Sequence, residues 1–288
     1  MTMNRKIVIT GANGQLGSEF RAIAGRYTDS FVFTDIDTLD LTDKKSARAF
    51  LEKEAPDLVV NCAAYTAVDK AEDNREMARA LNVRIPRMLA EYGKNSGCRI
   101  VHISTDYVFG DNGTCLPRKT VDEAKPLSVY GETKLEGEQE ICGCDTGMVI
   151  RTSWLYSIYG PNFVRSMTRL MQERDELRVV YDQVGTPTHA ADLAGAIMKV
   201  TSDVGYPFEP GIYHYTNEGI ASWYDFACEI RELTGASCRI VPIETRDYPL
   251  PAKRPAFAVL SKEKIKKVYG LEIPHWRDSL RHYFKLLK

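Results

Sequence analysis

The sequence has no apolar run that approaches the ~20 residues needed to span a membrane. It also lacks an excess of charge of either sign, because 38 Lys and Arg residues offset 39 Asp and Glu residues and leave a net charge of −1. A chain without a basic excess gives no reason to expect nucleic acid or a membrane surface as a partner. Its first residues, Met1 to Lys6, run directly into a strand-like segment and do not resemble a secretory signal. We therefore expect a cytoplasmic globular protein.

Motifs for metal binding and for hydrolysis are also missing. The seven cysteines are scattered, and the only close pair, Cys142 and Cys144, has no second Cys or His pair nearby to complete a zinc site. The sequence contains no Gly-x-Ser-x-Gly segment, and the histidines beyond residue 180 are too dispersed for a metal site or a catalytic triad. We predict reduced thiols and no bound metal, and the sequence disfavours hydrolase chemistry.

Short apolar segments alternate with segments of helical periodicity in the first half of the chain. The apolar segments are residues 6–10, 31–33, 58–60, 100–103 and 148–150, and the helical segments are residues 15–24, 44–54, 75–92 and 130–141. Nearly continuous apolar runs are typical of strands buried on both faces of a parallel sheet. Their alternation with helices predicts an α/β fold with a doubly wound parallel sheet of the Rossmann type, which binds its ligand at the carboxyl ends of the strands.

A glycine-rich segment, Gly11-Ala12-Asn13-Gly14-Gln15-Leu16-Gly17, follows the first strand and opens a helix. Glycines at this place allow a tight turn that brings the backbone close to a dinucleotide pyrophosphate. Asp35 ends the second strand, where an acid binds the adenosine ribose hydroxyls and repels a 2′-phosphate. No Lys or Arg follows Asp35 closely, so NADH is favoured over NADPH, although Arg21 or Arg26 could supply a cation from the neighbouring helix.

A tyrosine and a lysine four residues apart, Tyr130 and Lys134, follow a strand that ends in Ser104-Thr105-Asp106. Positions i and i+4 of a helix share one face, so both side chains can point into one cleft. We expect Tyr130 to donate a proton to a carbonyl oxygen, Lys134 to favour its phenolate, and Thr105 to bind the same oxygen. This pattern indicates hydride transfer between a nicotinamide cofactor and a carbonyl. His102, inside the strand, is interpreted as a buried, hydrogen-bonded histidine and not as a catalytic base.

The pattern changes after about residue 160, where prolines cluster and short strands mix with helices. We predict that residues 1–160 form the NAD(P)-binding Rossmann domain, to which segments near 180–215 return, and that residues 161–288 form mainly a smaller α/β substrate-binding domain. Three helices are expected there: residues 223–233 with Ser222 as N-cap, residues 261–269 ended by Gly270, and a terminal helix from Trp276 that docks on the protein and not on a membrane.

These motifs resemble those of the extended short-chain dehydrogenases/reductases and, more narrowly, those of the dTDP-4-dehydrorhamnose reductase family. The resemblance covers nearly the whole chain and is carried by residues 11–17, 61–72, 104–109, 130–134, 151–156, 162–164 and 182–188. It implies reduction of the C4 ketone of dTDP-4-dehydro-L-rhamnose to dTDP-L-rhamnose by NADH or NADPH, with a nucleotide sugar as substrate.

The resemblance also implies roles for individual residues. The catalytic set would be Thr105, Tyr130 and Lys134, and Tyr130 and Lys134 would also contact the cofactor. Beside Asp35, the cofactor would be lined by Gly11, Asn13, Gly14, Gln15, Leu16, Asp40, Leu41, Ala63 and Ala64. The substrate would meet Thr66, Val68, Thr105, Asp106, Trp154 and Arg254.

The chain departs from the family pattern at several positions. Asp35-Ile36-Asp37 stands where many members carry a basic residue, and Phe257-Ala258 replaces a frequent Asn-Ser. Some members form a metal-bridged dimer. Glu19 matches one acidic ligand but Ala191 stands at the other, so no metal is predicted and a homodimer is left open.

Two other functions stay open at this point. One is another nucleotide-sugar enzyme on the same fold, an epimerase or a dehydratase. A dehydratase would carry Asp-Glu after the catalytic threonine, where this chain has Asp106-Tyr107. The other is a non-catalytic, cofactor-binding regulatory subunit, against which the intact set of Thr105, Tyr130 and Lys134 argues.

Overall fold

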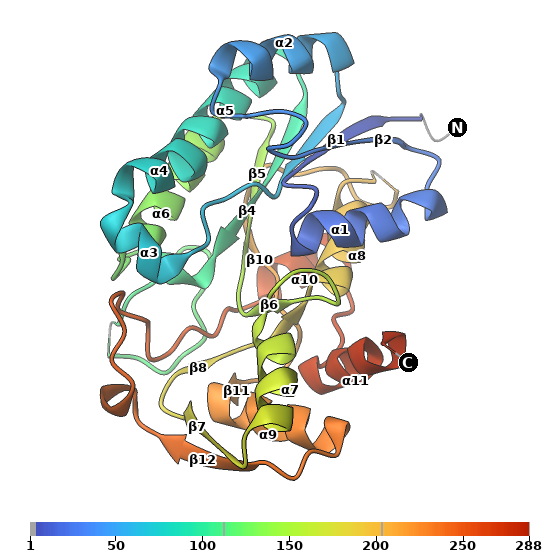
Figure 1. Ribbon diagram of the computed structural model, residues 1–288. Coiled ribbons are helices and arrows are strands. Elements are labelled where there is room, and N and C mark those ends of the chain that lie inside the picture. The colour runs from blue at the N-terminus through green and yellow to red at the C-terminus, as the bar shows by residue number, and fades with distance from the viewer. Residues whose placement is uncertain (1–3, 112, 203, 288) are drawn as a thin grey trace.

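A parallel sheet of six strands forms the centre of the protein (Figure 1), as the computed structural model shows for residues 4–111, 113–202 and 204–287. The expectation about the start of the chain falls partly on Met1 to Met3, outside the described residues. The strand order is β10-β5-β4-β3-β1-β2. The strands are β1 (Lys6–Thr10), β2 (Ser30–Thr34), β3 (Leu58–Asn61), β4 (Arg99–Thr105), β5 (Gly147–Thr152) and β10 (Gly211–His214). The predicted doubly wound parallel sheet is confirmed.

Helices cover both faces of the sheet because successive strand residues point to opposite sides. Ile7 and Ile9 of β1 pack in one hydrophobic cluster with α1 (Gln15–Ile23), α8 (Ala190–Val200) and α10 (Glu263–Tyr269). Val8, between them, packs in a second cluster with α2 (Lys44–Glu54), α5 (Ile85–Ser96) and α6 (Val129–Cys142). Most residues of the central strands are therefore buried, which explains the continuous apolar runs in the sequence, whereas the edge strand β2 is only partly buried.

The helical segment predicted for residues 75–92 is interrupted in the structure. It consists of α4 (Arg75–Arg79), a π-helical turn (Ala80–Arg84) and α5, and a further helix, α3 (Val68–Asp73), precedes it. The amide of Asn82, in the π turn, accepts from Tyr65 N at 2.9 Å and donates to Thr133 Oγ1 at 3.1 Å. These contacts with distant segments account for the π-helical interruption, which local periodicity does not predict.

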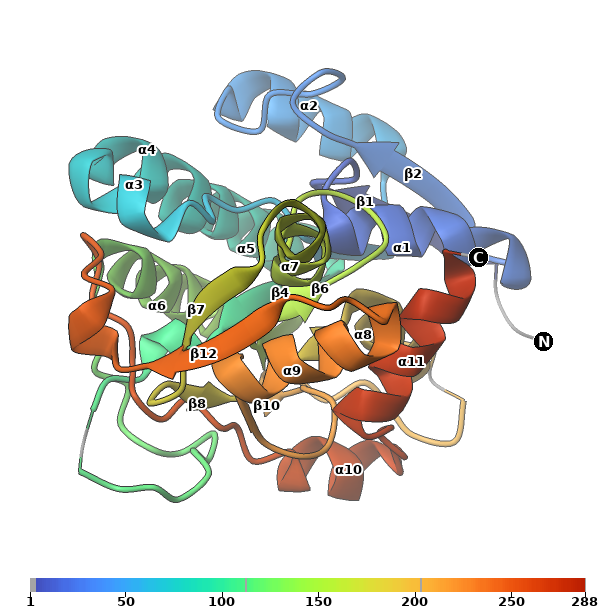
Figure 2. The same cartoon turned by 60° about the horizontal axis from the view of Figure 1, so that its bottom comes forward.

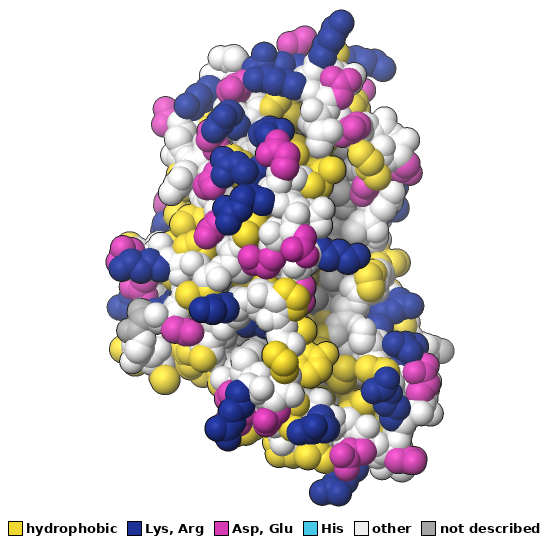
Figure 3. Space-filling view, turned by 60° about the vertical axis from the view of Figure 1, so that its left-hand side comes forward, with side chains coloured by type: hydrophobic (Ala, Val, Ile, Leu, Met, Phe, Trp, Pro, Cys, Tyr) yellow, Lys and Arg dark blue, Asp and Glu magenta, His cyan; other side chains and the backbone are white. Residues whose placement is uncertain are grey.

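Ion pairs join α4 and α5 to α6 on the outside of the molecule. Three of them, Arg75–Glu132, Arg79–Glu136 and Arg87–Glu140, follow one another along the helices. Basic and acidic side chains accordingly alternate over this face (Figure 3).

A third hydrophobic cluster lies beyond the sheet. It is formed by α7 (Phe163–Glu173), α9 (Trp223–Thr234), α11 (Trp276–Leu286) and the parallel pair of β7 (Glu176–Val180) and β12 (Arg239–Ile243), which lie side by side in Figure 2. Ser222 caps α9 and the left-handed Gly270 ends α10, as predicted, although α10 begins at Glu263. Trp276, Leu280 and Tyr283 bury one face of α11 in this cluster, which confirms that the terminal helix docks on the protein. Within the described ranges, no helix combines the length and apolar character required to cross a membrane.

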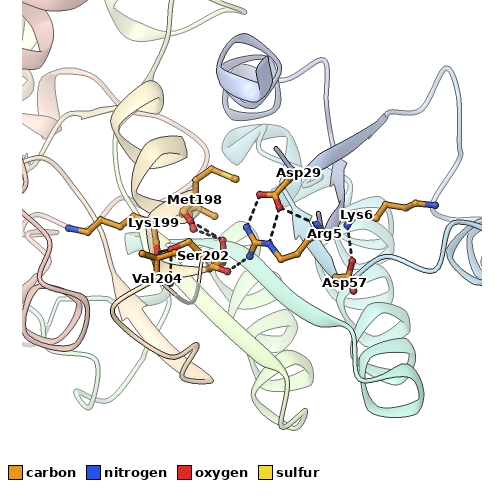
Figure 4. A network of polar contacts seen from close by, with 10 residues as sticks. Arg5, Lys6, Asp29, Asp57, Met198, Lys199, Ser202 and Val204 are labelled. Carbon is orange, nitrogen blue, oxygen red and sulfur yellow. Dashed lines mark hydrogen bonds and ion pairs between the residues drawn. The ribbon is translucent and has the colours of Figure 1, made fainter. Parts of the chain in front are cut away.

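Segments beyond residue 160 also build the sheet layer. β10 pairs with β5, and α8 packs against α1. Arg5 ties the carboxyl end of α8 to the start of β1 (Figure 4): its guanidinium binds the Asp29 carboxylate at 2.8 Å and donates to the carbonyl of Thr201. The chain thus returns to the sheet after α7 and β7, and α9, β12 and α11 complete the cluster beyond the sheet afterwards.

Candidate active site

The glycine-rich turn is packed directly against the loop that follows β3. Gly11 has a φ of +61°, and a Cβ atom there would lie 2.7 Å from the backbone nitrogen of Ala63. A Cβ atom on Gly17 would lie 2.4 Å from the carbonyl oxygen of Gly11. Both positions therefore require glycine, and the turn delivers the amino end of α1 to the carboxyl edge of the sheet.

Two further observations support dinucleotide binding at the turn. The Gln15 Oε1 atom is buried without a hydrogen-bond partner among the described residues, so it can accept from a ligand. Asp35 lies beside the turn, where its carboxylate accepts from the backbone nitrogens of Asn13 at 2.8 Å and Ile36 at 2.7 Å. Arg21, a candidate cation for a 2′-phosphate, lies over the Phe33 ring at 4.4 Å.

The predicted site residues follow the carboxyl ends of successive strands. Those expected at the cofactor are placed after β1 (Gly11, Asn13, Gly14, Gln15, Leu16), after β2 (Asp35, Asp40, Leu41) and after β3 (Ala63, Ala64). Those expected at the substrate lie after β3 (Thr66, Val68), at or after the end of β4 (Thr105, Asp106), after β5 (Trp154) and, for Arg254, in the loop that follows β12. Because parallel strands end at one edge of the sheet, residues distant in sequence meet there.

Thr105, Tyr130 and Lys134 come together from β4 and α6. The Ser128 side chain caps α6 by accepting from Gly131 N at 3.2 Å. Gly131 lets α6 approach the segment after β4, since a Cβ atom there would lie 2.3 Å from the carbonyl oxygen of Tyr107. The Tyr130 phenol thereby lies next to the Thr105 side chain.

Burial favours the protonated form of the Tyr130 phenol beyond its ordinary preference. It raises the pKa of Tyr130 to about 12, which the hydrogen bond with Thr105 lowers in part and the nearby Asp106 raises further. The expectation that Lys134 favours the phenolate is not met in this arrangement, because the lysine nitrogen turns toward β4. It donates to the carbonyl oxygen of Ile103 at 2.6 Å and lies 3.2 Å from His102 Nε2. Burial lowers the pKa of Lys134 to about 8, while Glu138 and Cys62 act to raise it.

Asp106 is a buried carboxyl beside the tyrosine. Its Oδ1 atom accepts from Thr105 Oγ1 at 3.0 Å, and its Oδ2 atom has no partner within the described part of the chain. Burial raises the pKa of Asp106 to about 7, against the hydrogen bond from Thr105. An unpartnered buried oxygen next to the proton donor can serve as an acceptor for a substrate hydroxyl.

An ion pair that was not predicted from the sequence holds Arg254 next to the site. Its guanidinium binds Asp69 of α3 with two hydrogen bonds of 2.8 and 3.1 Å. The Arg254 side chain also hydrogen-bonds Tyr107, whose ring packs edge-on against Tyr130 at 5.5 Å. Val68 belongs to the same apolar cluster as Tyr130. The loop after β12 is thereby held next to the catalytic helix.

Trp154 is the most strained of the predicted substrate residues. It has a φ of +46°, which is rare for a bulky side chain and often marks a functional position. Its indole stacks on Trp223 at 3.5 Å, and a Cβ atom on Gly185 would lie 2.7 Å from the ring. Sequence reasoning missed Trp223, because the residue only opened a helix and gave no sign of its distant partner.

Glu19, which matched a metal ligand of the resembling family, is buried and accepts from Ser157 Oγ at 2.6 Å. Burial raises its pKa, which the hydrogen bond from Ser157 opposes. Over residues 4–111, 113–202 and 204–287, no group of three or more His, Cys, Asp or Glu side chains is arranged to hold a metal ion.

The parallel sheet, the glycine turn on its first strand and the Thr–Tyr–Lys set on β4 and α6 define an oxidoreductase of the short-chain dehydrogenase/reductase class. Comparison with known proteins narrows this class. The chain belongs to the RmlD substrate binding domain family, whose model matches residues 5–288.

Named relatives agree with this assignment. The chain is 38% identical over 289 residues to a dTDP-4-dehydrorhamnose reductase from Aggregatibacter actinomycetemcomitans, covering 96% of this chain and 97% of the relative. A crystal structure of a dTDP-4-dehydrorhamnose reductase from Clostridium acetobutylicum is 42% identical, with a TM-score of 0.93 and coverage of 98% and 99%. The reductase from Bacillus anthracis, solved in complex with NADP, is 33% identical, with a TM-score of 0.93 and coverage of 99% and 100%.

Proposed function

We propose that this protein reduces the C4 ketone of dTDP-4-dehydro-L-rhamnose to give dTDP-L-rhamnose, with NADH or NADPH as the reductant. The observation that carries the proposal is the placement of Tyr130 beside Thr105, at the end of β4 and on the same edge of the sheet as the glycine turn. The names of the relatives support the choice of substrate.

The chemistry requires a proton at the oxygen of the ketone while hydride arrives at its carbon. A nicotinamide cofactor, when bound, supplies the hydride. Tyr130 transfers its proton to the oxygen that gains the electron pair, and Thr105 donates a hydrogen bond to the same oxygen. Such general acid catalysis contributes roughly 10²- to 10⁴-fold to the rate. Lys134, one helical turn after Tyr130, would bind the nicotinamide ribose.

The cofactor lies, in this proposal, along the glycine turn and the strand ends beside it. The amino end of α1 binds the pyrophosphate through backbone nitrogens of Asn13 to Leu16, and Ala63 and Ala64 border the nicotinamide half. Asp35 binds the adenosine ribose hydroxyls, with Asp40 and Leu41 nearby. The carboxylate of Asp35 repels a 2′-phosphate, so we propose that NADH is preferred.

The substrate occupies the space between the two parts of the chain. We propose that residues 1–160 and the segments that return to the sheet bind the cofactor, and that residues 161–288 supply most of the sugar-nucleotide site. Thr66, Val68, Asp106 and Trp154 meet the sugar. Arg254 binds the diphosphate by exchanging its paired hydrogen bonds with Asp69 for bonds to phosphate oxygens, which a guanidinium matches in the same way.

We place the enzyme in the cytoplasm. The seven cysteines, all within the described ranges, are free thiols. Reduced thiols are typical of proteins in a reducing compartment.

The decisive test follows the absorbance of the reduced nicotinamide while the keto sugar nucleotide, generated in situ, is added with NADH and NADPH in parallel. We expect turnover, with the higher kcat/KM for NADH. A folded protein that binds NADH but turns over with neither cofactor contradicts the proposal and leaves another sugar nucleotide or a regulatory role.

The cofactor preference has its own test. Asp35→Ala should raise the kcat/KM for NADPH relative to that for NADH, because it removes the negative charge next to the 2′ position. Asp37→Ala is a matched control, since Asp37 carries the same charge two residues away and accepts from the Asn13 side chain, not its backbone, at 3.3 Å. An unchanged ratio in Asp35→Ala would remove Asp35 from the cofactor site.

A further inference from the structure

A row of polar side chains crosses the buried centre of the sheet. Thr10 of β1 pairs in register with Asn61 of β3, and Asn61 pairs in register with His102 of β4. Neighbours in register on parallel strands point to the same face, and here that face is the one covered by α6. The three side chains are at most 1% exposed. Polar groups at such positions cost free energy unless each is hydrogen-bonded, so their placement calls for an explanation.

The row is hydrogen-bonded end to end and finishes on Lys134. Thr10 Oγ1 lies 2.7 Å from Asn61 Oδ1, Asn61 Nδ2 lies 3.0 Å from His102 Nδ1, and His102 Nε2 lies 3.2 Å from Lys134 Nζ. At its other end, Thr10 Oγ1 lies 3.4 Å from the backbone nitrogen of Ala63, against which Gly11 packs. The row therefore links the glycine turn to the catalytic lysine.

Two hydrogen-bonding arrangements fit the same atomic positions. With the Asn61 amino group toward the ring, His102 Nδ1 accepts, the ring hydrogen is on Nε2, and it faces a neutral lysine amine. With the Asn61 carboxamide turned over, its oxygen accepts from Nδ1–H, and Nε2 accepts from a lysine ammonium. The orientation of Asn61, the tautomer of His102 and the charge of Lys134 are thus linked.

We propose that His102 and Asn61 are positioning residues for Lys134, which hold its amino group against β4 and adjust the hydrogen bonds of the row to the charge of the lysine. The proposal rests on the proposed function only in that Lys134 belongs to the catalytic set. It gives His102 a role other than packing while leaving it a neutral, hydrogen-bonded histidine.

The surroundings of the row favour a neutral ring and a lysine that changes charge. Burial, and then the charge of Lys134, hold the pKa of His102 well below its usual value. The groups that face Lys134 are Glu138 on its own helix and Cys62 after β3, with Tyr130 one turn away. Glu138 is engaged by Arg151 at 2.6 Å, so it does not replace His102 as the partner of the lysine.

The first experiment is nitrogen NMR of the protein labelled with ¹⁵N in its five histidines. We expect the His102 ring, identified by its loss in His102→Gln, to stay neutral between about pH 6 and pH 10 and to exchange tautomer as Lys134 titrates. Lys134→Met should abolish that exchange. A charged ring at pH 6, or one unchanging tautomer over the whole range, overturns the proposal. This test needs no substrate, so it holds even if the proposed reaction fails.

The second experiment compares the pH dependence of kcat in the wild-type protein, in Asn61→Asp and in a control variant. Asn61→Asp keeps the shape of the side chain but can only accept from the ring, which favours the ammonium. We expect the alkaline limb of the profile to move up by about one pH unit. His214→Gln is the matched control, because His214 is equally buried but binds Arg151, and it should leave the limb in place. A packing role alone would lower the stability of Asn61→Asp without moving the limb, and that result would refute the proposal.

Discussion

Replacing Glu138 by Gln should destabilise the protein strongly, because Glu138 and Arg151 form a buried ion pair at the centre of the molecule. Their side chains are only 1% and 3% exposed. The carboxylate accepts from Arg151 Nη2 at 2.6 Å, from Arg151 Nε at 2.9 Å and from Ser104 Oγ at 2.5 Å. Gln keeps the shape but leaves the guanidinium without a counter-charge in a site that excludes water.

Breaking a buried pair by neutralising one partner typically costs about 3–5 kcal/mol. For a chain of 288 residues, each kcal/mol lowers the melting temperature by about 2 °C, so we expect a decrease of roughly 6–10 °C. Glu136→Gln supplies the comparison on the same helix. Glu136 binds Arg79 at 2.6 Å, but both side chains are more than one-third exposed, and such pairs contribute only about 0–1 kcal/mol.

Thermal unfolding of the three proteins at neutral pH, followed by circular dichroism, measures the difference. We expect a large decrease in the melting temperature for Glu138→Gln and almost none for Glu136→Gln. Similar small shifts in both variants would refute this expectation, because they would show that the buried arginine is solvated or finds another partner. Urea unfolding of the same proteins provides an independent measure of the free energy.

Two further predictions concern the proton donor and the Asp69–Arg254 pair. Tyr130→Phe should lower kcat by about two to four orders of magnitude with little change in the Kd for NADH, because only the proton donor is lost; near-wild-type turnover would exclude this role. The hydrogen bond from Arg254 lowers the pKa of Asp69 below its usual 3.8, so the pair stabilises the fold above that pH and the contribution disappears as pH falls through the lowered pKa. Wild-type protein should therefore unfold at a higher temperature than Asp69→Asn at pH 6, and the difference should shrink as pH falls below 3.8; a difference that stays constant over the acid range would contradict the ion-pair explanation.

Local sequence patterns predicted much of the fold. The residues of β1 and α2 were predicted with the bounds observed, as was the cap of α9 by Ser222. These features depend on hydrophobic periodicity and on capping, which involve residues close in sequence. The interruption of the helix at Ala80–Arg84 was not predicted, because it depends on the contacts of Asn82 with Tyr65 and Thr133.

In the candidate site, too, features that depend on residues close in sequence were predicted, and features that depend on distant contacts were not. Spacing in the sequence singled out the glycine turn, Tyr130 and Lys134, since a turn and one helical face are local properties. The stacking of Trp223 on Trp154 and the pairing of Arg254 with Asp69 could not be predicted, because each joins segments far apart in the chain.

The sequence by itself determined the class of fold and the residue types that can transfer a proton. Only the tertiary structure decided their environment: the burial that raises the pKa of the Tyr130 phenol, and the turn of Lys134 away from it toward Ile103 and His102. The amino-acid sequence specifies which titratable side chains are present. Their protonation and their hydrogen-bond partners depend on desolvation and on contacts across the sheet, and these arise only when β4 and α6 pack together.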